Sequence, residues 1–397
     1  MSLRGIRGLD SGAAPSQKVV LVPLSFGFLS TYPPTQCGLA TFTASLRGQL
    51  VADGSRSGVV RVVDKPEMSV GPDVVAHLVR GSARARARSA EALDEFDIAV
   101  VQHEFGIYGG ADGDEVLGVL DRLTVPVVVV AHTVLTKPSR HQREVLERVA
   151  HRADAVVTMT MTARKRLVGN YDVDPTKVVT IPHGAAASSR IGGPRVHLGT
   201  PTILTWGLLG PGKGIESVID VLPDLRGLDR PPLYRVVGQT HPKVLERYGE
   251  AYRAGLMARA DSLGVADMVA FEASYLDVVS LNRVVAQADV VVLPYESREQ
   301  VTSGVLIEAV AAGKPVVATA FPHAVELLAT GAGLVVPHDD PDALARALRR
   351  VLAEPALAAS MAGQSGRVAP QLMWSSVGAR YIELAHSLIS APMTLVA

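Results

Sequence analysis

The amino-acid sequence predicts two doubly wound α/β domains joined by a short linker. The chain has 397 residues, which is too long for one hydrophobic core and suits two domains of ordinary size. Short runs rich in Val, Ile and Leu alternate with helical stretches, in two sets of six. A Gly-, Ser- and Pro-rich interval at 185–201 separates the two sets. This rhythm is typical of parallel strands that helices cover on both faces.

The twelve apolar runs are the expected strands. The first set lies at 18–24, 58–64, 97–102, 125–132, 154–159 and 178–182. The second set lies at 202–206, 233–238, 268–272, 288–294, 314–319 and 333–337. We place an N-terminal domain at 1–190 and a C-terminal domain at 191–373. The last segment, 374–397, starts with the amphipathic pattern WSSVGARYIELAHSLI, which could pack across either domain, and we expect it to cross back to the N-terminal domain.

Composition excludes several classes of protein. Lys plus Arg equals Asp plus Glu at 39 each, so no overall charge favours nucleic acid as a partner. The basic run RGSARARARSAEAL, 80–93, favours a solvated helix face over a patch for anionic lipid or an acidic acceptor. We expect a cytoplasmic protein for three reasons. The sequence has a single cysteine, Cys37, it shows no signal-peptide pattern, and it contains no apolar run of about 18 residues. Membrane contact would be peripheral, at the inner face.

Polar residues gather where the expected strands end. His103 and Glu104 follow the third strand, His132 the fourth and His183 the sixth. Singly, each histidine is more typical of a structural residue than of a ligand contact. Because parallel strands bind ligands beyond their carboxyl ends, three histidines at equivalent positions favour a shared site.

One carboxylate interrupts the apolar helix of EQVTSGVLIEAVAAGKPVVAT, 299–319. An unpaired buried carboxylate is costly, so Glu308 needs a partner or a ligand. Thr302 or Ser303 can cap this helix, and the amides of 303–306 would then form an anion site. Glu308 would point back past that end, where it could accept hydrogen bonds from the vicinal hydroxyls of a ribose. A helix-end acid that only favours the helix dipole is the alternative.

Lys213 strengthens the expectation of a phosphate site. The turn WGLLGPGKG runs from Gly207 to Lys213 directly after a strand, where amides and an ammonium can meet a diphosphate. The pattern lacks Walker A spacing, which disfavours P-loop hydrolases, and no Gly-x-Gly-x-x-Gly follows a strand, which disfavours NAD-linked oxidoreductases. In the N-terminal half, Gly38 starts a helix after the first strand. Its lack of a side chain would let a phosphate or sugar approach the backbone, and the alternative is a glycine that only begins the helix.

These motifs together resemble the retaining, nucleotide-sugar-dependent glycosyltransferases of family 4, which have the GT-B fold of two Rossmann-like domains facing a central cleft. The resemblance extends over nearly the whole chain and is closest to a bacterial branch of the family. The motifs that carry it are STYPPTQCGLATFT, VVQHEFGIYGG, His132, IPHG at 181–184, GLLGPGKG, GQTHP and IEAVAAGKPVV.

The resemblance implies roles for the residues that match. Glu308 would hold the donor ribose and Lys213 the diphosphate. His132 would lie beside the transferred sugar, and Gly38 belongs to a loop that closes over donor phosphate and acceptor. The amides around Thr302, Ser303 and Gly304 would contact sugar and phosphate. His103 and Glu104 are candidates for the acceptor side.

Two positions depart from the family pattern. The first of its two glutamates falls at Gln300, which would contact donor sugar hydroxyls as a neutral group. An arginine that often precedes the lysine falls at Leu208, so another cation is needed, and Arg298 is the candidate. These departures motivate an alternative, a non-catalytic GT-B protein that binds a nucleotide sugar.

The expected reaction transfers a hexose, mannose or glucose, from a nucleoside-diphosphate sugar to a hydroxyl of a carbohydrate or glycolipid acceptor. No pair of strand-end carboxylates suits glycoside hydrolysis, so the leaving phosphate would act as the base. We expect no cofactor and no essential metal. The pattern Asp172-Val173-Asp174 favours a turn before a strand over a metal site.

Overall fold

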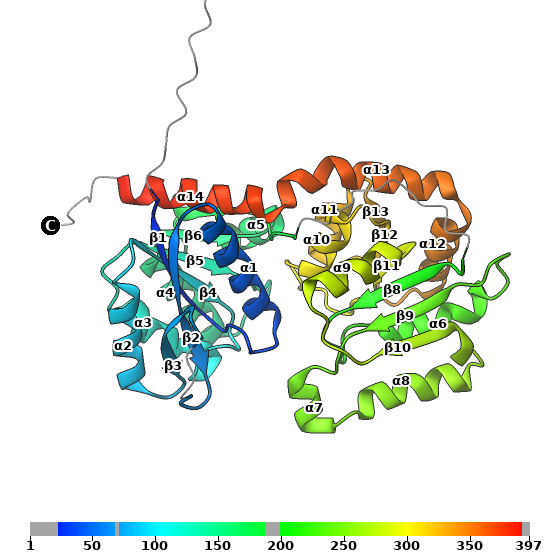
Figure 1. Cartoon of the computed structure of the whole chain (residues 1–397), viewed down its shortest axis with the longest axis horizontal. Helices are drawn as coiled ribbons and strands as arrows, with labels where there is room; N and C mark the ends of the chain where they lie inside the picture. The colour runs from blue at the N-terminus through cyan, green and yellow to red at the C-terminus, as the bar shows by residue number, and fades with distance from the viewer. Residues whose placement is uncertain (1–22, 68–70, 187–198, 391–397) are drawn as a thin grey trace, which may run out of the picture.

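The structure is a computed structural model that describes residues 23–67, 71–186 and 199–390. Figure 1 shows two lobes side by side, each built around one sheet. The predicted boundary between 190 and 191 and the end of the predicted last segment, 391–397, lie outside the described residues. The domain limits therefore stay predictions.

The N-terminal lobe comprises the first sheet, the helices around it and the last helix, α14 (Trp374–Ser390). Its strands are β1 (Ser25–Ser30), β2 (Arg56–Val63), β3 (Val74–Val79), β4 (Ile98–His103), β5 (Val127–Ala131), β6 (Ala155–Thr158) and β7 (Val178–Thr180). They form a parallel sheet in the order β3-β2-β1-β4-β5-β6-β7. Its other helices are α1 (Gly38–Ala52), α2 (Ala83–Leu93), η1 (Ala111–Val116), α3 (Leu117–Leu120), α4 (Arg140–Arg152), α5 (Met161–Asn170) and η2 (Pro175–Lys177).

Two strands of this sheet differ from the prediction. The first strand begins at Ser25, whereas 18–24 was predicted; Pro23 and Leu24 are not in a strand, and 18–22 lie outside the described residues. All six residues of SFGFLS are buried, and Gly27 lies so close to Phe96 that a Cβ there would come within 2.8 Å of the ring. Close packing against Phe96, which the sequence pattern does not display, therefore places the strand. The edge strand β3 was not predicted, because its partly exposed residues do not form a continuous apolar run.

The C-terminal lobe contains the second sheet, and all six predicted strands are present. They are β8 (Thr202–Trp206), β9 (Leu233–Val237), β10 (Val269–Glu272), β11 (Val290–Leu293), β12 (Val316–Thr319) and β13 (Gly333–Val336), in the parallel order β10-β9-β8-β11-β12-β13. Its helices are α6 (Ile215–Leu225), α7 (Pro242–Tyr248), α8 (Ala251–Ser262), η3 (Ala266–Met268), α9 (Val278–Gln287), α10 (Gly304–Ala311), α11 (Pro322–Leu328), α12 (Pro341–Ala353) and α13 (Pro355–Leu372).

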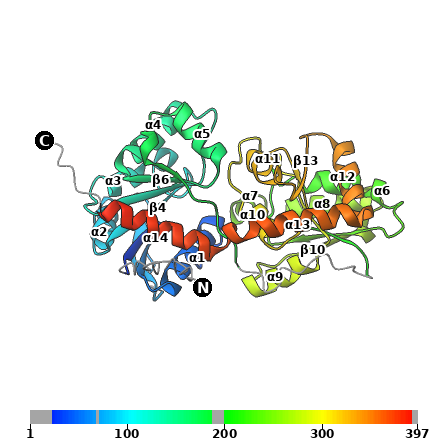
Figure 2. The same cartoon turned by 90° about the horizontal axis from the view of Figure 1, so that it is seen from above.

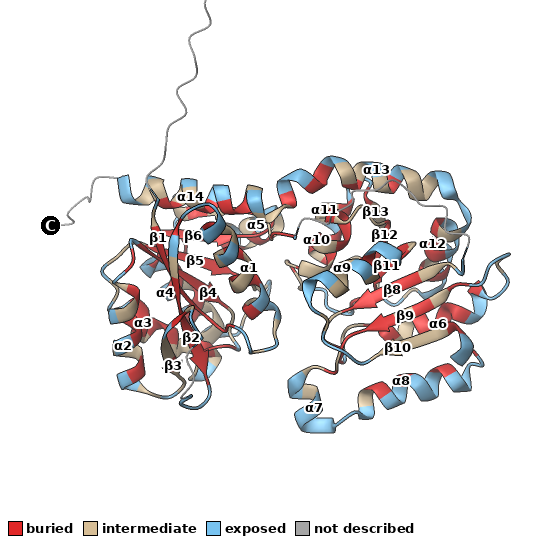
Figure 3. Ribbon diagram, viewed as in Figure 1, coloured by how far each residue is buried: buried red, intermediate tan, exposed pale blue. Residues whose placement is uncertain are grey.

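Both sheets are sandwiched between helices. In Figure 3 the strands are mostly buried and the exposed residues lie on the outer helix surfaces. Each lobe has one core on either face of its sheet. Strands buried on both faces explain why the apolar runs are continuous rather than alternating.

The last helix packs on the N-terminal lobe, as expected. In Figure 2, α13 runs over the C-terminal lobe and α14 continues over the N-terminal lobe. Val377 and Tyr381 of α14 are buried in the N-terminal core, and Arg380 donates to the carbonyl of Thr180 at 2.8 Å. The two described stretches that pass between the lobes pair with each other, because Ala185 donates to the carbonyl of Leu372 at 2.7 Å.

The basic run forms α2 and the turn before it. Arg86 pairs with Glu115 at 3.3 Å and Arg80 with Asp64 at 2.8 Å, so part of its charge is balanced within the protein. This supports the interpretation as a solvated face. Among the described residues, no helix has the length and apolar character needed to cross a membrane.

Candidate active site

The structure brings together two of the strand-end histidines predicted to share a site. His132 follows β5 and His183 follows β7, and each ring packs edge-on against Phe42 of α1, with centroids 5.0 Å apart. The amide of His132 donates to the carbonyl of His103, at the end of β4. A Cβ added to Gly304 of the C-terminal lobe would lie 3.0 Å from Nε2 of His183. This cluster therefore lies where the two lobes meet.

His132 and His183 of this cluster, and the adjacent His103, are neutral at physiological pH. Burial lowers the pKa of His103 to about 4 and that of His183 to about 4, and burial together with the charges of His183 and His103 lowers the pKa of His132 to about 3. Nε2 of His132 lies 2.6 Å from the side-chain amide of Gln102, which orients the ring. A neutral imidazole can position a sugar hydroxyl without placing a charge beside it.

Glu104 faces the C-terminal lobe from the end of β4. Its carboxylate accepts a hydrogen bond from the hydroxyl of Thr133, which follows His132. Burial raises its pKa, while that hydroxyl, nearby backbone amides and the charge of Lys243 in α7 act in the opposite direction. The charge of a C-terminal residue thus reaches Glu104 at the end of β4.

Glu308 lies in α10 with one neutral partner. The indole nitrogen of Trp206, the last residue of β8, donates to Oε2 of Glu308 at 3.2 Å. No Lys or Arg forms an ion pair with it among the described residues. Burial raises the pKa of Glu308 to about 7, and the bond from Trp206 limits the rise. A partly exposed carboxylate without a cation has accepting capacity left for ligand hydroxyls.

The start of α10 provides fewer free amides than predicted. Of the two predicted caps, Thr302 and Ser303, the cap is Ser303, whose hydroxyl accepts a hydrogen bond from the amide of Leu306 at 3.3 Å. The amide of Ser303 itself donates to Nδ1 of His323 at 2.8 Å. The predicted anion site at 303–306 therefore needs a correction: two of the four amides are engaged within the protein, and those of Gly304 and Val305 remain for an anion.

The other residues of this loop are held near the helix start. Nε2 of Gln300 donates to the carbonyl of Thr302 at 3.1 Å, which orients the amide group. The hydroxyl of Thr302 is buried and has no hydrogen-bond partner within the described chain. An unpaired buried hydroxyl is costly, and a ligand contact would satisfy it.

Lys213 lies in the turn after β8, as predicted. Its ammonium sits 4.5 Å from the ring centre of Tyr295, which follows β11. The turn starts at Gly207, whose φ of 121° favours glycine. Burial, Lys243 and Lys213 together lower the pKa of His241, so both ammonium groups lie near that imidazole. Lys213 of this turn and Lys243 of α7 thus both act on the same imidazole.

Arg298, the predicted second cation, forms an exposed surface ion pair. Its guanidinium is exposed and pairs with Asp339 at 2.8 Å. Gly38 is the first residue of α1, with Cys37 as the cap, and a Cβ there would meet no atom within 4 Å. The space beside Gly38 is open to a ligand rather than filled by protein.

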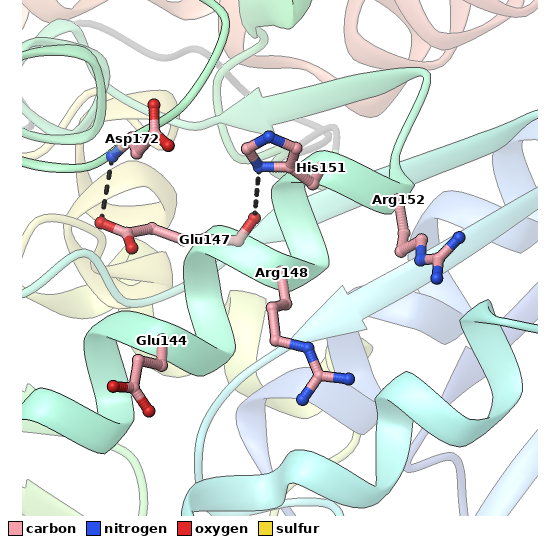
Figure 4. A pocket seen from close by; sticks show the side chains of 6 residues that line it. All are labelled: Glu144, Glu147, Arg148, His151, Arg152 and Asp172. Atoms are coloured by element: carbon pink, nitrogen blue, oxygen red, sulfur yellow. Dashed lines mark hydrogen bonds between the residues drawn. The ribbon is translucent and has the colours of Figure 1, made fainter.

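The Asp172-Val173-Asp174 segment is a turn, as favoured. Asp174 caps η2 by accepting from the amide of Thr176 at 2.9 Å. No group of three or more His, Cys, Asp or Glu within the described ranges could hold a metal ion. Asp172 instead borders a shallow pocket on α4, shown in Figure 4. The pocket is lined by Glu144, Glu147, Arg148, His151, Arg152 and Asp172. None of these residues belongs to the predicted site.

Sequence reasoning missed four residues of this region: Trp206, Lys243, His323 and Arg166. His323 could have been found, because it lies shortly after the end of β12 and polar residues at strand ends were predicted to mark the site. Lys243 directly follows the GQTHP motif. No sequence signal pointed to Arg166, which lies inside α5, or distinguished Trp206 from a core residue.

Two protein-family models match the chain in sequence. Residues 38–188 match Glycosyltransferase Family 4, and residues 194–367 match Glycosyl transferases group 1. Both models fall on the lobes that carry the candidate site.

Characterised relatives share moderate identity with the chain. One is the GDP-mannose-dependent alpha-(1-6)-phosphatidylinositol monomannoside mannosyltransferase of Mycolicibacterium smegmatis, 28% identical over 89% of this chain and 96% of that protein. Another is the D-inositol 3-phosphate glycosyltransferase of Salinispora arenicola, 29% identical over 68% of this chain and 65% of that protein.

Solved structures share the fold. Sucrose-phosphate synthase from Thermosynechococcus elongatus aligns with a TM-score of 0.70 at 18% identity, over 92% of this chain and 99% of that one. HepE of Anabaena, solved in complex with UDP, aligns with a TM-score of 0.71 at 17% identity, over 92% and 100%. Two parallel Rossmann-like sheets in this arrangement constitute the GT-B fold. With both lobes matched, the chain belongs to glycosyltransferase family 4 and is a retaining, nucleotide-sugar-dependent enzyme.

Proposed function

We propose that the enzyme transfers a hexose, mannose or glucose, from a nucleoside-diphosphate sugar to a hydroxyl of a carbohydrate or glycolipid acceptor. The observation that carries the proposal is Glu308, a partly exposed carboxylate whose one hydrogen-bond partner among the described residues is the indole of Trp206. The vicinal hydroxyls of a ribose are the donors that this carboxylate lacks.

The diphosphate would lie between two sources of positive potential. Lys213 supplies an ammonium, and the free amides of Gly304 and Val305 supply hydrogen-bond donors at the start of α10. Lys243 and Lys213 both lower the pKa of His241, so we propose Lys243, besides Arg298, as a candidate second cation. These groups stabilise the charge that develops on the leaving phosphate.

The transfer step needs no protein acid and base. The bond between the sugar C1 and the phosphate oxygen breaks, while the acceptor oxygen forms a bond to C1 on the same face. The acceptor's proton passes to the departing phosphate oxygen. The protein orients both substrates, with Gln300 and His132 beside the sugar and His103 and Glu104 toward the acceptor, and it excludes water.

Mannose and glucose are the proposed sugars because of the relatives. The name of the Mycolicibacterium relative specifies GDP-mannose, and HepE has been solved with UDP-glucose. The inositol-containing acceptors in the relatives' names support a polyhydroxyl or glycolipid acceptor. Contact with a membrane surface would then be peripheral.

The test combines binding with turnover. The thermal unfolding midpoint of the purified protein should rise with one of GDP-mannose, GDP-glucose, UDP-glucose or UDP-mannose, because a ligand of the folded state stabilises it. Lys213→Ala and Glu308→Ala should each weaken that binding at least tenfold and abolish release of the nucleotide. Arg226→Ala, which removes an exposed ion pair with Asp267, should change neither.

Other outcomes decide against the proposal. Binding without transfer to any acceptor or to water would favour the alternative of a non-catalytic nucleotide-sugar-binding protein. If no nucleotide sugar binds, and both variants behave like the wild type, the proposed site is wrong.

A further inference from the structure

The loop that contains Gln300 belongs to the C-terminal lobe in sequence but is anchored to the N-terminal lobe on both sides of Gln300. Glu299 forms hydrogen bonds with residues of the N-terminal lobe. Val301 packs into the core of that lobe and is 2% exposed. The residue between them is the one proposed to contact the donor sugar.

Arg166 of α5 makes the first anchor. Its Nη1 donates to the carbonyl of Val134 at 3.2 Å, and to the carbonyl and Oε2 of Glu299 at 3.2 and 3.0 Å. The amide of Thr136 donates to the same oxygen of Glu299 at 2.9 Å. Val134 and Thr136 lie in the loop that begins with His132. One guanidinium therefore joins the loop of His132 to the loop of Gln300.

The environment of Glu299 favours the ion pair. Burial acts to raise its pKa, but the amide and hydroxyl of Thr136 and the charges of Arg166 and Lys137 outweigh burial, so the pKa is lowered. The Arg166 side chain is 16% exposed and that of Glu299 is 44% exposed, so the guanidinium is shielded while the carboxylate stays partly open to water.

The start of α5 makes the second anchor. The hydroxyl of Thr160, the cap of α5, donates to the carbonyl of Val301 at 3.1 Å. The first turn of the helix binds the C-terminal lobe as well, because Glu326 of α11 accepts from the amides of Met161 and Thr162 at 2.8 Å each. Helix α5 thus contacts the donor loop and α11 together.

The two side chains proposed to bind the nucleotide, Lys213 and Glu308, have different neighbours. Lys213 rests on Tyr295, and Glu308 is bonded to Trp206, so both contacts lie within the C-terminal lobe. The contacts of Lys213 and Glu308 should therefore keep their geometry when the lobes shift. Gln300 should respond more, because both of its neighbours bond to the N-terminal lobe while His323 alone holds its carbonyl from the C-terminal lobe.

We propose that α5 positions Gln300 against the donor sugar, with Arg166 as the positioning residue that holds the sugar-contacting loop in register with His132. The inference rests on the proposed function, since it assigns the sugar contact to Gln300. Its consequence is that the nucleotide and the sugar of the donor are recognised by separately supported parts of the site.

Arg166→Ala separates the two parts. Binding of GDP and GDP-mannose, and of UDP and UDP-glucose, is measured by calorimetry for each variant. The affinity for the nucleoside diphosphate should stay within twofold of the wild type. The affinity of the nucleotide sugar relative to its nucleotide should fall at least fivefold, and nucleotide release from the sugar donor should slow at least tenfold. Glu299→Gln, which keeps the shape of the side chain, should give the same pattern more weakly.

The matched control is Arg143→Ala. Arg143 also belongs to the N-terminal lobe and pairs with Glu147 at 3.5 Å, and its bonds among the described residues all stay within that lobe. It should leave both affinities unchanged. An equal loss of nucleotide and nucleotide-sugar binding in Arg166→Ala would show a general structural role and overturn the proposal, as would wild-type behaviour.

A measurement without substrate tests the coupling itself. In Arg166→Ala, amide hydrogen exchange should quicken in 299–303 of the C-terminal lobe as well as in 133–136, and Arg143→Ala should not reproduce this. Unchanged exchange in 299–303 would overturn the proposal. Failure of the proposed function would look different, because the wild type would then bind none of the four probes while the exchange effect persisted.

Discussion

At the residue scale, Glu308 shows how a local environment sets a function. Its carboxylate has lost water without gaining a cation, so burial raises its pKa to about 7. The indole of Trp206 satisfies one oxygen and fixes the side chain. The ionisation of the free enzyme therefore changes near neutral pH, and the affinity for a ribose should follow it.

Donor binding should strengthen as the pH rises through about 7. Below that pH the carboxyl is protonated and accepts fewer hydrogen bonds from ribose, so affinity for the nucleoside diphosphate should be about tenfold weaker at pH 6 than at pH 8. Calorimetry across this range measures the effect. Glu308→Gln should bind weakly with a flatter profile, and because the ligand's own phosphate titrates identically for both proteins, the difference between the profiles reports Glu308. Parallel profiles would contradict the assignment.

At the element scale, α10 depends on a side chain from another helix. Ser303 caps the helix, and its own amide is bonded to Nδ1 of His323, at the start of α11. His323 is 3% exposed, and burial lowers its pKa to about 3, so it remains the neutral acceptor that this amide requires. The amide of His323 in turn donates to the carbonyl of Gln300 at 3.3 Å. The donor loop is therefore held on both sides by one residue.

Replacing His323 should separate hydrogen bonding from packing. His323→Ala leaves a buried amide unpaired and creates a cavity, so it should lower the free energy of unfolding by about 2 to 4 kcal/mol. His323→Asn offers a carbonyl oxygen close to the position of Nδ1 and should recover at least half of that loss. Urea denaturation of the two variants measures the difference. Equal destabilisation by both would mean that ring packing, and not the bond to Ser303, stabilises the loop.

The elements also show what the sequence can and cannot predict. The buried strands were found because burial on both faces gives continuous apolar runs, and the turn at Lys213 and the cap at Ser303 were found because their chemistry is local. The position of β1 was wrong and β3 was missed, since packing of Gly27 on Phe96 and exposure at a sheet edge are tertiary effects. The bonds of Arg166 and the occupied amide of Ser303 join segments distant in sequence, so no local pattern displays them.

At the scale of the whole molecule, four neutral histidines lie in or next to the contact between the lobes. They are His103, His132, His183 and His323. Burial is the main cause that lowers each pKa, to between about 3 and about 4, whereas each would titrate near 6.5 in the unfolded chain. The unfolded chain therefore binds more protons than the folded protein in the range between these values.

Stability should consequently fall as the pH drops from about 6.5 to about 4.5. Near pH 5 the four histidines bind almost four more protons in the unfolded chain than in the folded protein. Glu308 is protonated in the folded protein at that pH and mostly ionised in the unfolded chain, so it offsets this difference by about one proton. For these five groups alone, a net uptake of about three protons on unfolding corresponds to a loss of about 4 kcal/mol per pH unit. Glu104, whose pKa burial also raises, lessens this slope. Urea denaturation at several pH values measures this slope. His323→Asn should reduce the proton uptake on unfolding by about one. If the stability instead stayed level from pH 6.5 to pH 4.5, these imidazoles would be solvated, and the lobes would not meet around a buried histidine cluster.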